Sequence, residues 1–512
     1  MLYPIGIQSF EDLRRKGFVY VDKSGFVYQM AARFLAIILT TVLGAVSVYA
    51  QTAEDSFGEF RERMLTDYSG FRGSVLDGYA DYLDTVWKEY QTFAGKSRDP
   101  LPKPKVVPDV NSEPAASPAE VSAPKPMPGK PIPAQPVQPG QEQPVPPIPA
   151  EPSVSFPFYG MALKAPRLHT ADISELTSGA AAAAWRWYEG NGTRQAALML
   201  KDHARNLGLG DWFAYEMVRE CVNHQCQGSS SAARVSLQHY LLANMGYDVR
   251  EADYHHEACL LVAIDQQIYA RSYLCIDGNT YYVFMADGSQ PDGQGYLKTS
   301  SLPSGASLGK SLDMRVKNLS GISSGNRHHC ELTVGSTIVE ADVDVMLMEM
   351  LRHYPQMDIA EYAMSEVSPS LRETVVEQLR SLVSGLSKAE SADKLLHFVQ
   401  SAFAYATDDD QHGYEKPYFV EENFYYPKND CEDRAIFYAF LVRNLLGLDV
   451  HLVQFPGHEC TAVNFGDADV RGTYYVSNGC RYFICDPTYI GANIGQCMPD
   501  FQGIAPTKVE AW

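Results

Sequence analysis

YYPKNDCEDRAIFYAFLVRNLLGLDV, residues 425–450, begins as a polar loop and continues as an apolar run with helical spacing. Cys431 stands where the loop meets the run. Either Asn429 or Asp430 suits the helix N-cap position, which places Cys431 in the first helical turn. Unpaired backbone N–H groups and the positive end of the helix dipole favour a thiolate there. The pattern indicates a cysteine nucleophile, and the alternative is an inert, buried thiol.

The acidic neighbours of Cys431 oppose a thiolate, because Glu432 and Asp433 follow it directly. We expect both carboxylates to point outward or to pair with Arg434. An imidazolium beside the thiol would supply the decisive opposite charge. The nucleophile hypothesis therefore requires a histidine partner.

His458 and Asp486 follow in order, at separations of 458 − 431 = 27 and 486 − 458 = 28 residues. A thiol nucleophile needs a base that accepts its proton and a third group that fixes the tautomer of that base. His458 on one predicted strand and Asp486 at the end of the next can meet Cys431 at one sheet edge. The three residues form a candidate Cys-His-Asp triad. A structural histidine and a plain turn aspartate are the alternatives.

Gln400, in the segment LLHFVQSAFAY, is a fourth candidate. Its amide could complete an oxyanion hole together with the backbone N–H of Cys431. A polar residue on a core helix explains it equally well.

The segments DCEDR, PGH and CDPTY stand in this order within residues 390–500. This block resembles the transglutaminase-like core of exported Bacteroidetes proteins. The resemblance implies a papain-like fold and a catalytic triad of Cys431, His458 and Asp486. Most bacterial members are regarded as amide hydrolases, and some as crosslinking enzymes.

An earlier segment repeats the pattern weakly. LLANMGYDV (241–249) aligns with VRNLLGLDV (442–450), which places Ser230 at the position of Cys431. With a one-residue gap, His256 aligns with His458, and Met285 or Asp287 takes the acid position. The predicted fold class is therefore α+β, with two tandem transglutaminase-like units of which the first is degenerate.

The N-terminus combines two unlike segments. Residues 3–28 resemble the start of AAA-ATPase-like proteins, but the chain has no G-x-x-x-x-G-K-[ST] phosphate loop, so residues 1–29 are interpreted as a foreign or misassigned leader. Residues 30–50 carry Arg33 and an apolar run that ends in Val48 and Ala50, typical of a cleaved signal peptide. A retained signal anchor is the alternative. Cleavage would make Gln51 the mature N-terminus and leave no stable membrane insertion.

Periodicity and composition divide the rest of the chain. We expect a helical segment at 51–98, a proline-rich linker at 99–157, the degenerate unit at 158–335 and the catalytic unit at 336–512. The linker should be an extended spacer, and a tether with no further role is its default interpretation.

Net charge and cysteine spacing limit which partners and metal ions the chain is expected to bind. A net charge of −20 argues against nucleic acid as a partner. No cofactor is expected. Zinc bound by Cys460, Cys480 and Cys485 lacks a C-x-x-C pair to support it, so reduced, buried cysteines are predicted. The oxygen-rich segment TDDDQHGYE (407–415) lacks EF-hand spacing and is interpreted as a solvated acidic loop.

The predicted function is an exported, periplasmic or cell-surface cysteine hydrolase that forms a thioester acyl-enzyme. Its substrate would be a peptide, a protein or a peptidoglycan stem peptide. Transfer of the acyl group to an amine would instead make it a crosslinking transglutaminase. A third possibility is a non-catalytic module that binds peptide or cell wall.

Overall fold

The computed structural model describes residues 80, 83–84, 87–97, 109–110, 127–128, 153–291, 295–300, 309–317 and 321–511. The predicted leader (1–29), the predicted signal peptide (30–50) and most of the predicted helical segment (51–98) lie outside the described residues. The chain divides into two compact units, residues 1–85 with 301–306 and residues 86–300 with 307–512. Nearly all described residues belong to the second unit. Within it, we call residues 153–317 the first half and residues 321–511 the second half.

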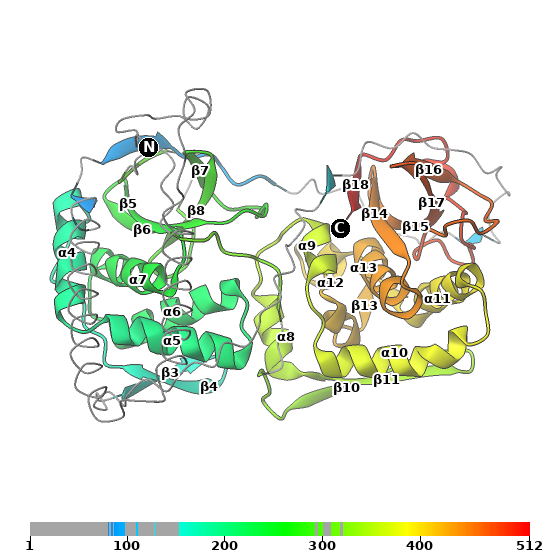
Figure 1. The fold of residues 1–512 in the computed structure, drawn as a ribbon, viewed down its shortest axis with the longest axis horizontal. Helices are drawn as coiled ribbons and strands as arrows, with labels where there is room; N and C mark the ends of the chain where they lie inside the picture. Colours follow the sequence, from blue (N-terminus) through cyan, green and yellow to red (C-terminus); the bar gives the residue numbers. More distant parts are fainter. Residues whose placement is uncertain are drawn as a thin grey trace, which may run out of the picture. The chain divides into compact units, whose positions relative to one another are not determined.

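The first half is α+β (Figure 1). Its hairpin and helices are β3 (Ser153–Phe158), β4 (Met161–Pro166), α4 (Ser178–Gly190), α5 (Arg194–Leu207), α6 (Asp211–Gln225) and α7 (Ser231–Met245). Its sheet strands are β5 (Val249–Tyr254), β6 (Glu257–Ala263), β7 (Tyr273–Ile276), β8 (Asn279–Met285) and β9 (Tyr296–Thr299), joined by β1 (Lys88–Gln91). Helix α7 packs against β5 and β6 on one side and against α4, α5 and α6 on others. It is buried nearly all round, and its buried residues include the polar Ser236, Gln238 and His239 as well as apolar side chains.

The second half is also α+β. It opens with β10 (Arg327–Val334), β11 (Thr337–Asp344), α8 (Val345–Arg352), α9 (Ile359–Met364), α10 (Pro369–Val383) and α11 (Lys388–Ala402). Short elements follow: β12 (Ala404–Tyr405), α12 (Asp408–Gln411), the 3₁₀ helix η2 (Val420–Phe424) and β13 (Lys428–Asn429). The central helix is α13 (Cys431–Leu441), extended by the π-helical turn η3 (Val442–Leu446). The sheet contains β14 (Asp449–Phe455), β15 (His458–Asn464), β16 (Tyr474–Ser477), β17 (Cys480–Cys485) and β18 (Lys508–Ala511), with β2 (Met127–Pro128) at one edge and η4 (Pro499–Phe501) before β18.

The two sheets share one topology. Their strand orders are β1-β9-β5-β6-β8-β7 and, read in the same direction, β2-β18-β14-β15-β17-β16. In each half the central helix precedes the strand that forms the middle of the sheet, and the next four strands take the same places. The edge strands differ, since β1 runs antiparallel to β9 whereas β2 runs parallel to β18. The predicted repetition of an α+β unit is thus visible in the strand order.

The strand registers show that the repeat has a constant offset. Tyr254 pairs with Glu257 in the first half, and Phe455 pairs with His458 in the second. The offset from Glu257 to His458 is 458 − 257 = 201, the same as from Ser230 to Cys431 (431 − 230) and from Met285 to Asp486 (486 − 285). No gap is needed. The prediction that His256 aligns with His458 was therefore wrong by one residue, because His256 lies in the two-residue hairpin turn.

Local features recur at the same offset. Asp277–Gly278 and Asn478–Gly479 both have positive φ at each residue, 51° and 87° in the first turn and 51° and 80° in the second. Such paired positive angles form the hairpin turn that suits the twist of antiparallel strands. The hydroxyl of Tyr281 donates to Asp248 at 2.9 Å, and that of Tyr482 donates to Asp449 at 2.5 Å. Turn chemistry and a tyrosine–aspartate hydrogen bond therefore recur in both copies, although this bond is buried in the first half and only partly buried in the second.

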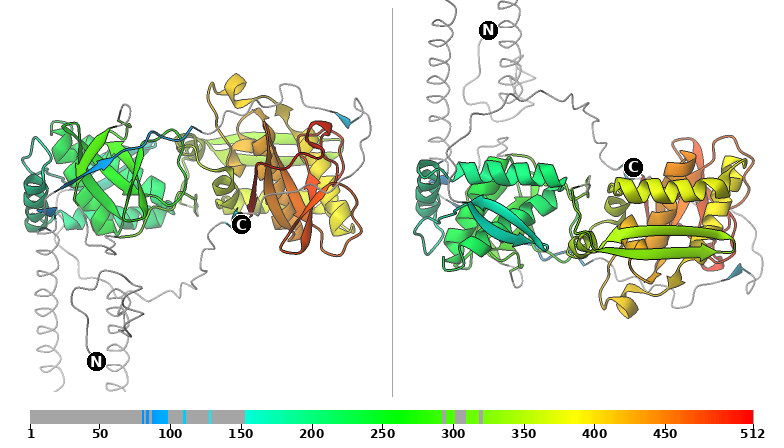
Figure 2. Two further views of the ribbon diagram at one scale, coloured as in Figure 1. Left: turned by 90° about the horizontal axis from the view of Figure 1, so that it is seen from above. Right: turned by 90° about the horizontal axis from the view of Figure 1, so that it is seen from below.

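Three predicted boundaries require correction. The β10–β11 hairpin spans the predicted boundary at 335/336 and packs along α10 of the second half (Figure 2). Strand β1 lies in the predicted helical segment, and β3 begins inside the predicted linker. The linker is extended at β2 as expected, but it also pairs with β18, and Val110 N donates to Ile490 O at 3.0 Å. Two short parts of the linker thus contact the second half.

Candidate active site

Cys431 is the first residue of α13, as predicted, and Asp430 is its N-cap. The Asp430 N–H donates to Asp433 Oδ2 at 3.2 Å, so a side chain in the first turn accepts a hydrogen bond from the residue before the helix. Helix α13 is buried along its whole length and packs against β14 and β15. The helix start is therefore held rigidly beneath the sheet.

The acids around Cys431 do not point outward, contrary to expectation. Glu432 and Asp433 are only 1% and 0% exposed. Asp433 Oδ1 accepts a hydrogen bond from Tyr418 N at 2.8 Å. Cys431 Sγ donates a hydrogen bond to Glu432 Oε2 at 3.2 Å. Glu432 is thus the acceptor for the thiol proton in this structure. Sequence reasoning missed this role, because an acidic residue at a helix start usually faces solvent.

Arg434 also departs from the prediction, since it donates hydrogen bonds to neutral groups. Its Nε donates to Asn429 Oδ1 at 2.9 Å, and its Nη2 donates to Phe403 O at 2.8 Å. Burial lowers the pKa of this guanidinium, while Tyr405, Asp430 and Cys431 act in the opposite direction. Its positive charge therefore lies within the same buried region as the acids and the thiol.

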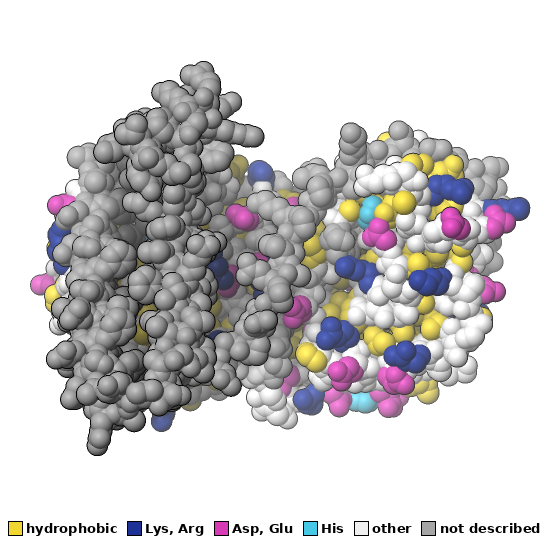
Figure 3. Space-filling view, in the orientation of Figure 1, with side chains coloured by type: hydrophobic (Ala, Val, Ile, Leu, Met, Phe, Trp, Pro, Cys, Tyr) yellow, Lys and Arg dark blue, Asp and Glu magenta, His cyan; other side chains and the backbone are white. Residues whose placement is uncertain are grey.

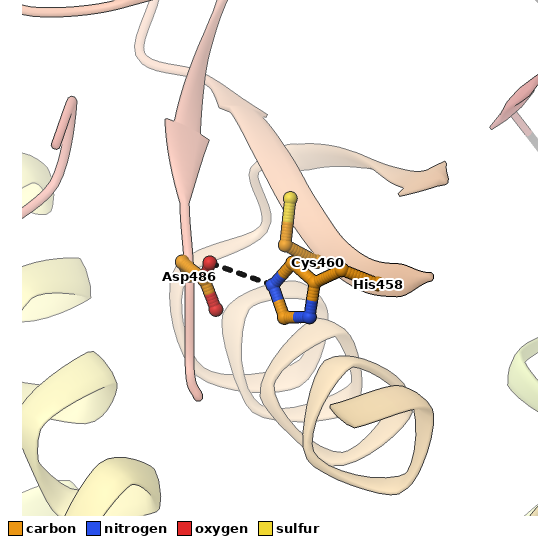
Figure 4. Close-up of side chains that lie close together, drawn as sticks. All are labelled: His458, Cys460 and Asp486. Carbon is orange, nitrogen blue, oxygen red and sulfur yellow. Dashed lines mark hydrogen bonds and ion pairs between the residues drawn. The ribbon is translucent and has the colours of Figure 1, made fainter. Parts of the chain in front are cut away.

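His458 begins β15 directly after the Pro-Gly turn. Its Nε2 lies 2.8 Å from Asp486 Oδ2, and the two side chains are 0% and 2% exposed (Figure 4). The ring stacks on Phe501, with centroids 5.2 Å apart and planes 5° apart. A neutral ring that donates from Nε2 presents a lone pair at Nδ1, and this buried Nδ1 has no hydrogen-bond partner among the residues that the structure describes. The free lone pair is what a general base requires.

The two carboxylate oxygens of Asp486 make different hydrogen bonds, one to His458 and the other to the turn that follows β17. Oδ2 bonds to His458, whereas Oδ1 accepts from Thr488 N at 2.9 Å and Tyr489 N at 3.3 Å. The orienting role and the turn role, which were alternatives in the sequence, are therefore compatible. The turn fixes the carboxylate that fixes the imidazole.

Gln400 lies on α11 with its amide directed at the backbone after β17. Its Nε2 donates to Asp486 O at 3.1 Å and to Ala492 O at 2.9 Å, and its Oε1 accepts from Gly491 N at 3.0 Å. Both amide hydrogens are thus committed to carbonyl oxygens. The oxyanion-hole prediction for Gln400 does not fit this geometry, and the residue instead positions the segment that carries Asp486.

The candidate residues are therefore brought together in part. His458 and Asp486 are in contact, and Gln400 supports Asp486. Helix α13, which begins at Cys431, packs against β15, which begins at His458. The thiol bonds to Glu432 while His458 Nδ1 is open, so the thiol–imidazole hydrogen bond of a triad is not formed in this structure.

The equivalent positions of the first half lack this chemistry. Ser230 Oγ donates to Ile173 O at 2.5 Å and accepts from Ala233 N at 3.1 Å, so it is an N-cap. Glu257 is exposed at the start of β6, and Met285 ends β8. Asp287 is exposed and accepts from Ser289 N at 2.9 Å. The first half therefore has neither an imidazole nor a carboxylate pair equivalent to His458 and Asp486.

The acidic segment 407–415 is not simply a solvated loop. Asp409 and Asp410 are exposed, but Asp408 is 2% exposed and accepts from Lys416 N at 2.6 Å. Carboxylate oxygens of Asp408, Asp430 and Asp433 lie within 4.8 Å of one another. Through Asp408, the segment therefore lies close to the first turn of α13.

All ten cysteines are free, but the prediction that they are buried fails for Cys275 and Cys480, which are exposed, and for Cys330, which is half-buried. Cys485 is buried and donates to Phe483 O at 3.4 Å. The zinc set of Cys460, Cys480 and Cys485 does not meet, because Cys480 starts β17 at the far end from Cys485. Sulfur of Cys460 instead lies near His458 and Asp486.

Comparison with known proteins gives one short match. Residues 4–40 match a family described as a predicted AAA-ATPase, in agreement with the resemblance of residues 3–28. The match extends past the end of the predicted leader at residue 29 and ends inside the predicted signal peptide. It covers too little of the chain to assign a family, and no curated protein matches the chain.

No described helix is long and apolar enough to cross a membrane. On the face of the second half that is visible in Figure 3, Lys and Arg side chains alternate with Asp and Glu. That face shows no continuous basic stripe of the kind that follows a phosphate backbone.

Proposed function

We propose that the chain is an exported cysteine-dependent amide or peptide hydrolase in which Cys431 is the nucleophile, His458 the base and Asp486 the orienting acid. The observation that carries the proposal is the buried His458–Asp486 pair with its open Nδ1, on the strand against which the Cys431 helix packs. Its resemblance to transglutaminase-like enzymes supports the same assignment. Export rests on residues 30–50, which lie outside the described residues.

The proposed reaction begins when the thiol turns from Glu432 to His458 Nδ1. The imidazole accepts the proton, and the resulting imidazolium offsets the buried acids around the thiolate. The thiolate attacks the substrate carbonyl, and in this proposal the backbone N–H of Cys431 at the helix start donates to the oxyanion. His458 then donates its proton to the leaving amine, which yields a thioester.

Water or an amine can complete the reaction. Attack by water, deprotonated by His458, releases a carboxylic acid and restores the thiol. Attack by an amine would release a new amide, and the enzyme would then be a crosslinking transglutaminase. Mass analysis of the released product distinguishes the two reactions.

The burial of Cys431, which is 2% exposed, favours one further candidate. A thiol held by Glu432 beneath the surface suits a non-catalytic module that binds peptide or cell wall. Under that alternative, the second half would bind its ligand without covalent chemistry.

An acylating activity-based probe followed by mass spectrometry tests the proposal. The probe should modify Cys431 alone, and both Cys431→Ala and His458→Ala should prevent modification. Cys480→Ala is the matched control, since Cys480 is an exposed thiol outside the site. A chain that binds peptide but is never acylated at Cys431 would favour the binding module.

A further inference from the structure

Cys460 lies on the same face of β15 as His458. The two residues are separated by two positions, and side chains alternate faces along a strand. Asp486 directly follows β17, which pairs with β15 through Thr461 and Cys485. One nitrogen, one sulfur and one carboxylate oxygen from the three residues lie within 4.8 Å of one another (Figure 4).

We propose that His458, Cys460 and Asp486 form a binding site for a thiophilic divalent cation of the zinc class. Nitrogen, thiolate and carboxylate are the donors that zinc takes, usually in tetrahedral geometry. Calcium and magnesium prefer oxygen donors alone, so the sulfur excludes them as the fitting ions. A fourth position would take water or a substrate atom.

Binding of the ion changes the protonation of two of its ligands. The ion replaces the proton that His458 Nε2 shares with Asp486, and this proton moves to Nδ1 as the ring changes tautomer. Cys460 loses its thiol proton to solvent, so one proton is released for each ion bound.

The first half provides an internal contrast. Cys259 is the equivalent of Cys460 (460 − 259 = 201), and both are fully buried. Its neighbours at the equivalent ligand positions are Glu257 and Met285, so the imidazole nitrogen of His458 and the carboxylate of Asp486 have no equivalents. A buried cysteine thus belongs to both cores, but only the second half surrounds it with a ligand set.

Phe501 stacks on the His458 ring from the η4 turn and covers one face of this ligand. The three ligands are at most 2% exposed, so the surrounding side chains must open before an ion can enter. Binding should therefore be slower than diffusion, and Phe501→Ala should accelerate it.

Metal binding has a consequence that rests on the proposed function. A ring bound to metal through Nε2 carries its proton on Nδ1 and cannot accept one from Cys431. Zinc should therefore inhibit the hydrolase, and chelation should restore it. Metal binding itself does not depend on the hydrolase assignment.

The test uses the full chain, stripped with a chelator and titrated with Co²⁺ as a spectroscopic substitute for zinc. We expect one sulfur-to-cobalt charge-transfer band that saturates at one ion per chain. Cys460→Ala should abolish the band, whereas Cys259→Ala and Cys431→Ala should retain it. Because Cys460→Ala alters the core, Asp486→Asn provides a second variant and should weaken Co²⁺ affinity by at least about tenfold.

Absence of the band in the unmodified chain would overturn the proposal, and so would its persistence in Cys460→Ala. Loss of the band in Cys431→Ala would assign the ion to the nucleophile instead. If the band behaves as expected but no acyl-enzyme ever forms, the metal site stands and the hydrolase proposal fails.

Discussion

At the position where the second half has Cys431, the first half has Ser230, which is bound to Ile173 O and Ala233 N as a helix cap. Where the second half has the buried His458, the first has the exposed Glu257. The two halves nevertheless share strand order, hairpin length and an offset of 201 residues at each of these positions (431 − 230, 458 − 257). The fold is therefore maintained without the residues of the candidate triad.

The features that both halves retain are structural. Gly246 and Gly447 end the central helices with φ of 104° and 60°, in the left-handed region that other residues adopt at a cost. The tyrosine–aspartate bond recurs, and a ring or cation packs on the tyrosine in each case: Arg250 over Tyr281 at 4.7 Å and His451 on Tyr482 at 4.0 Å. The comparison separates the framework from the candidate triad.

The largest expected difference between the halves is in turnover. Cys431→Ala should abolish hydrolysis, a loss on the order of 10⁴-fold or more, because no other nucleophile occupies that position. Ser230→Ala should leave turnover within about twofold of the unmodified chain. Single-turnover acylation on an activated ester measures both. A large loss in Ser230→Ala would show that the first half takes part in the chemistry.

Asp486 should have the next largest effect. Asp486→Asn should reduce acylation by about 10²- to 10⁴-fold, because the amide cannot hold the same imidazole tautomer. Combined with His458→Ala, it should add little to the loss from His458→Ala alone, since Asp486 acts through His458. The corresponding change in the first half, Met285→Ala, should leave acylation unchanged. If the losses from the two second-half variants simply add, Asp486 works independently of His458.

The shared tyrosine–aspartate bond should contribute to stability in both halves. Tyr281→Phe and Tyr482→Phe should each lower the free energy of unfolding by about 1–3 kcal/mol, as expected for a bond to a charged acceptor. The effect should be larger for Tyr281, whose hydroxyl also accepts from Arg250 Nη2 at 2.8 Å. Urea unfolding measures both values. A neutral result in one half alone would show that the framework is not equally maintained.

The smallest effect should come from the helix cap of the first half. Ser230→Ala should lower the free energy of unfolding by about 1 kcal/mol through loss of the hydrogen bond to Ala233 N. Ser230→Thr retains a capping hydroxyl and should lose less. Equal losses in the two variants would indicate that crowding at the site, rather than the cap, determines the result.

Much of the framework can be predicted from the sequence. The helix start at Cys431 and the His458 strand follow from capping signals and alternation. The true alignment was also present, because Gly246 to Glu257 and Gly447 to His458 both span 11 residues (257 − 246 and 458 − 447). Inserting a gap to match two histidines concealed it. Turn length, and not the identity of the aligned residues, fixes strand register.

The environment of the site could not be predicted in the same way. Burial of Glu432 and Asp433 depends on Asp408 and Tyr418, which reach the helix start through tertiary packing. Gln400 is polar on a buried helix, and only the carbonyl groups around it reveal that it positions Asp486. Strands β1 and β2 are short and come from segments of low apolar content, so no local pattern indicates that they extend the sheets.

The rate of thiol alkylation by iodoacetamide at mildly acidic pH tests the central claim most directly. Cys431 is buried and Cys480 is exposed, so exposure alone predicts faster labelling of Cys480. A thiol activated by His458 reverses this order, because thiolate content determines the rate. We expect Cys431 to react faster than Cys480 in the unmodified chain and slower than Cys480 in His458→Ala. Slower labelling of Cys431 in both proteins would contradict the assignment of Cys431, His458 and Asp486 as a working triad.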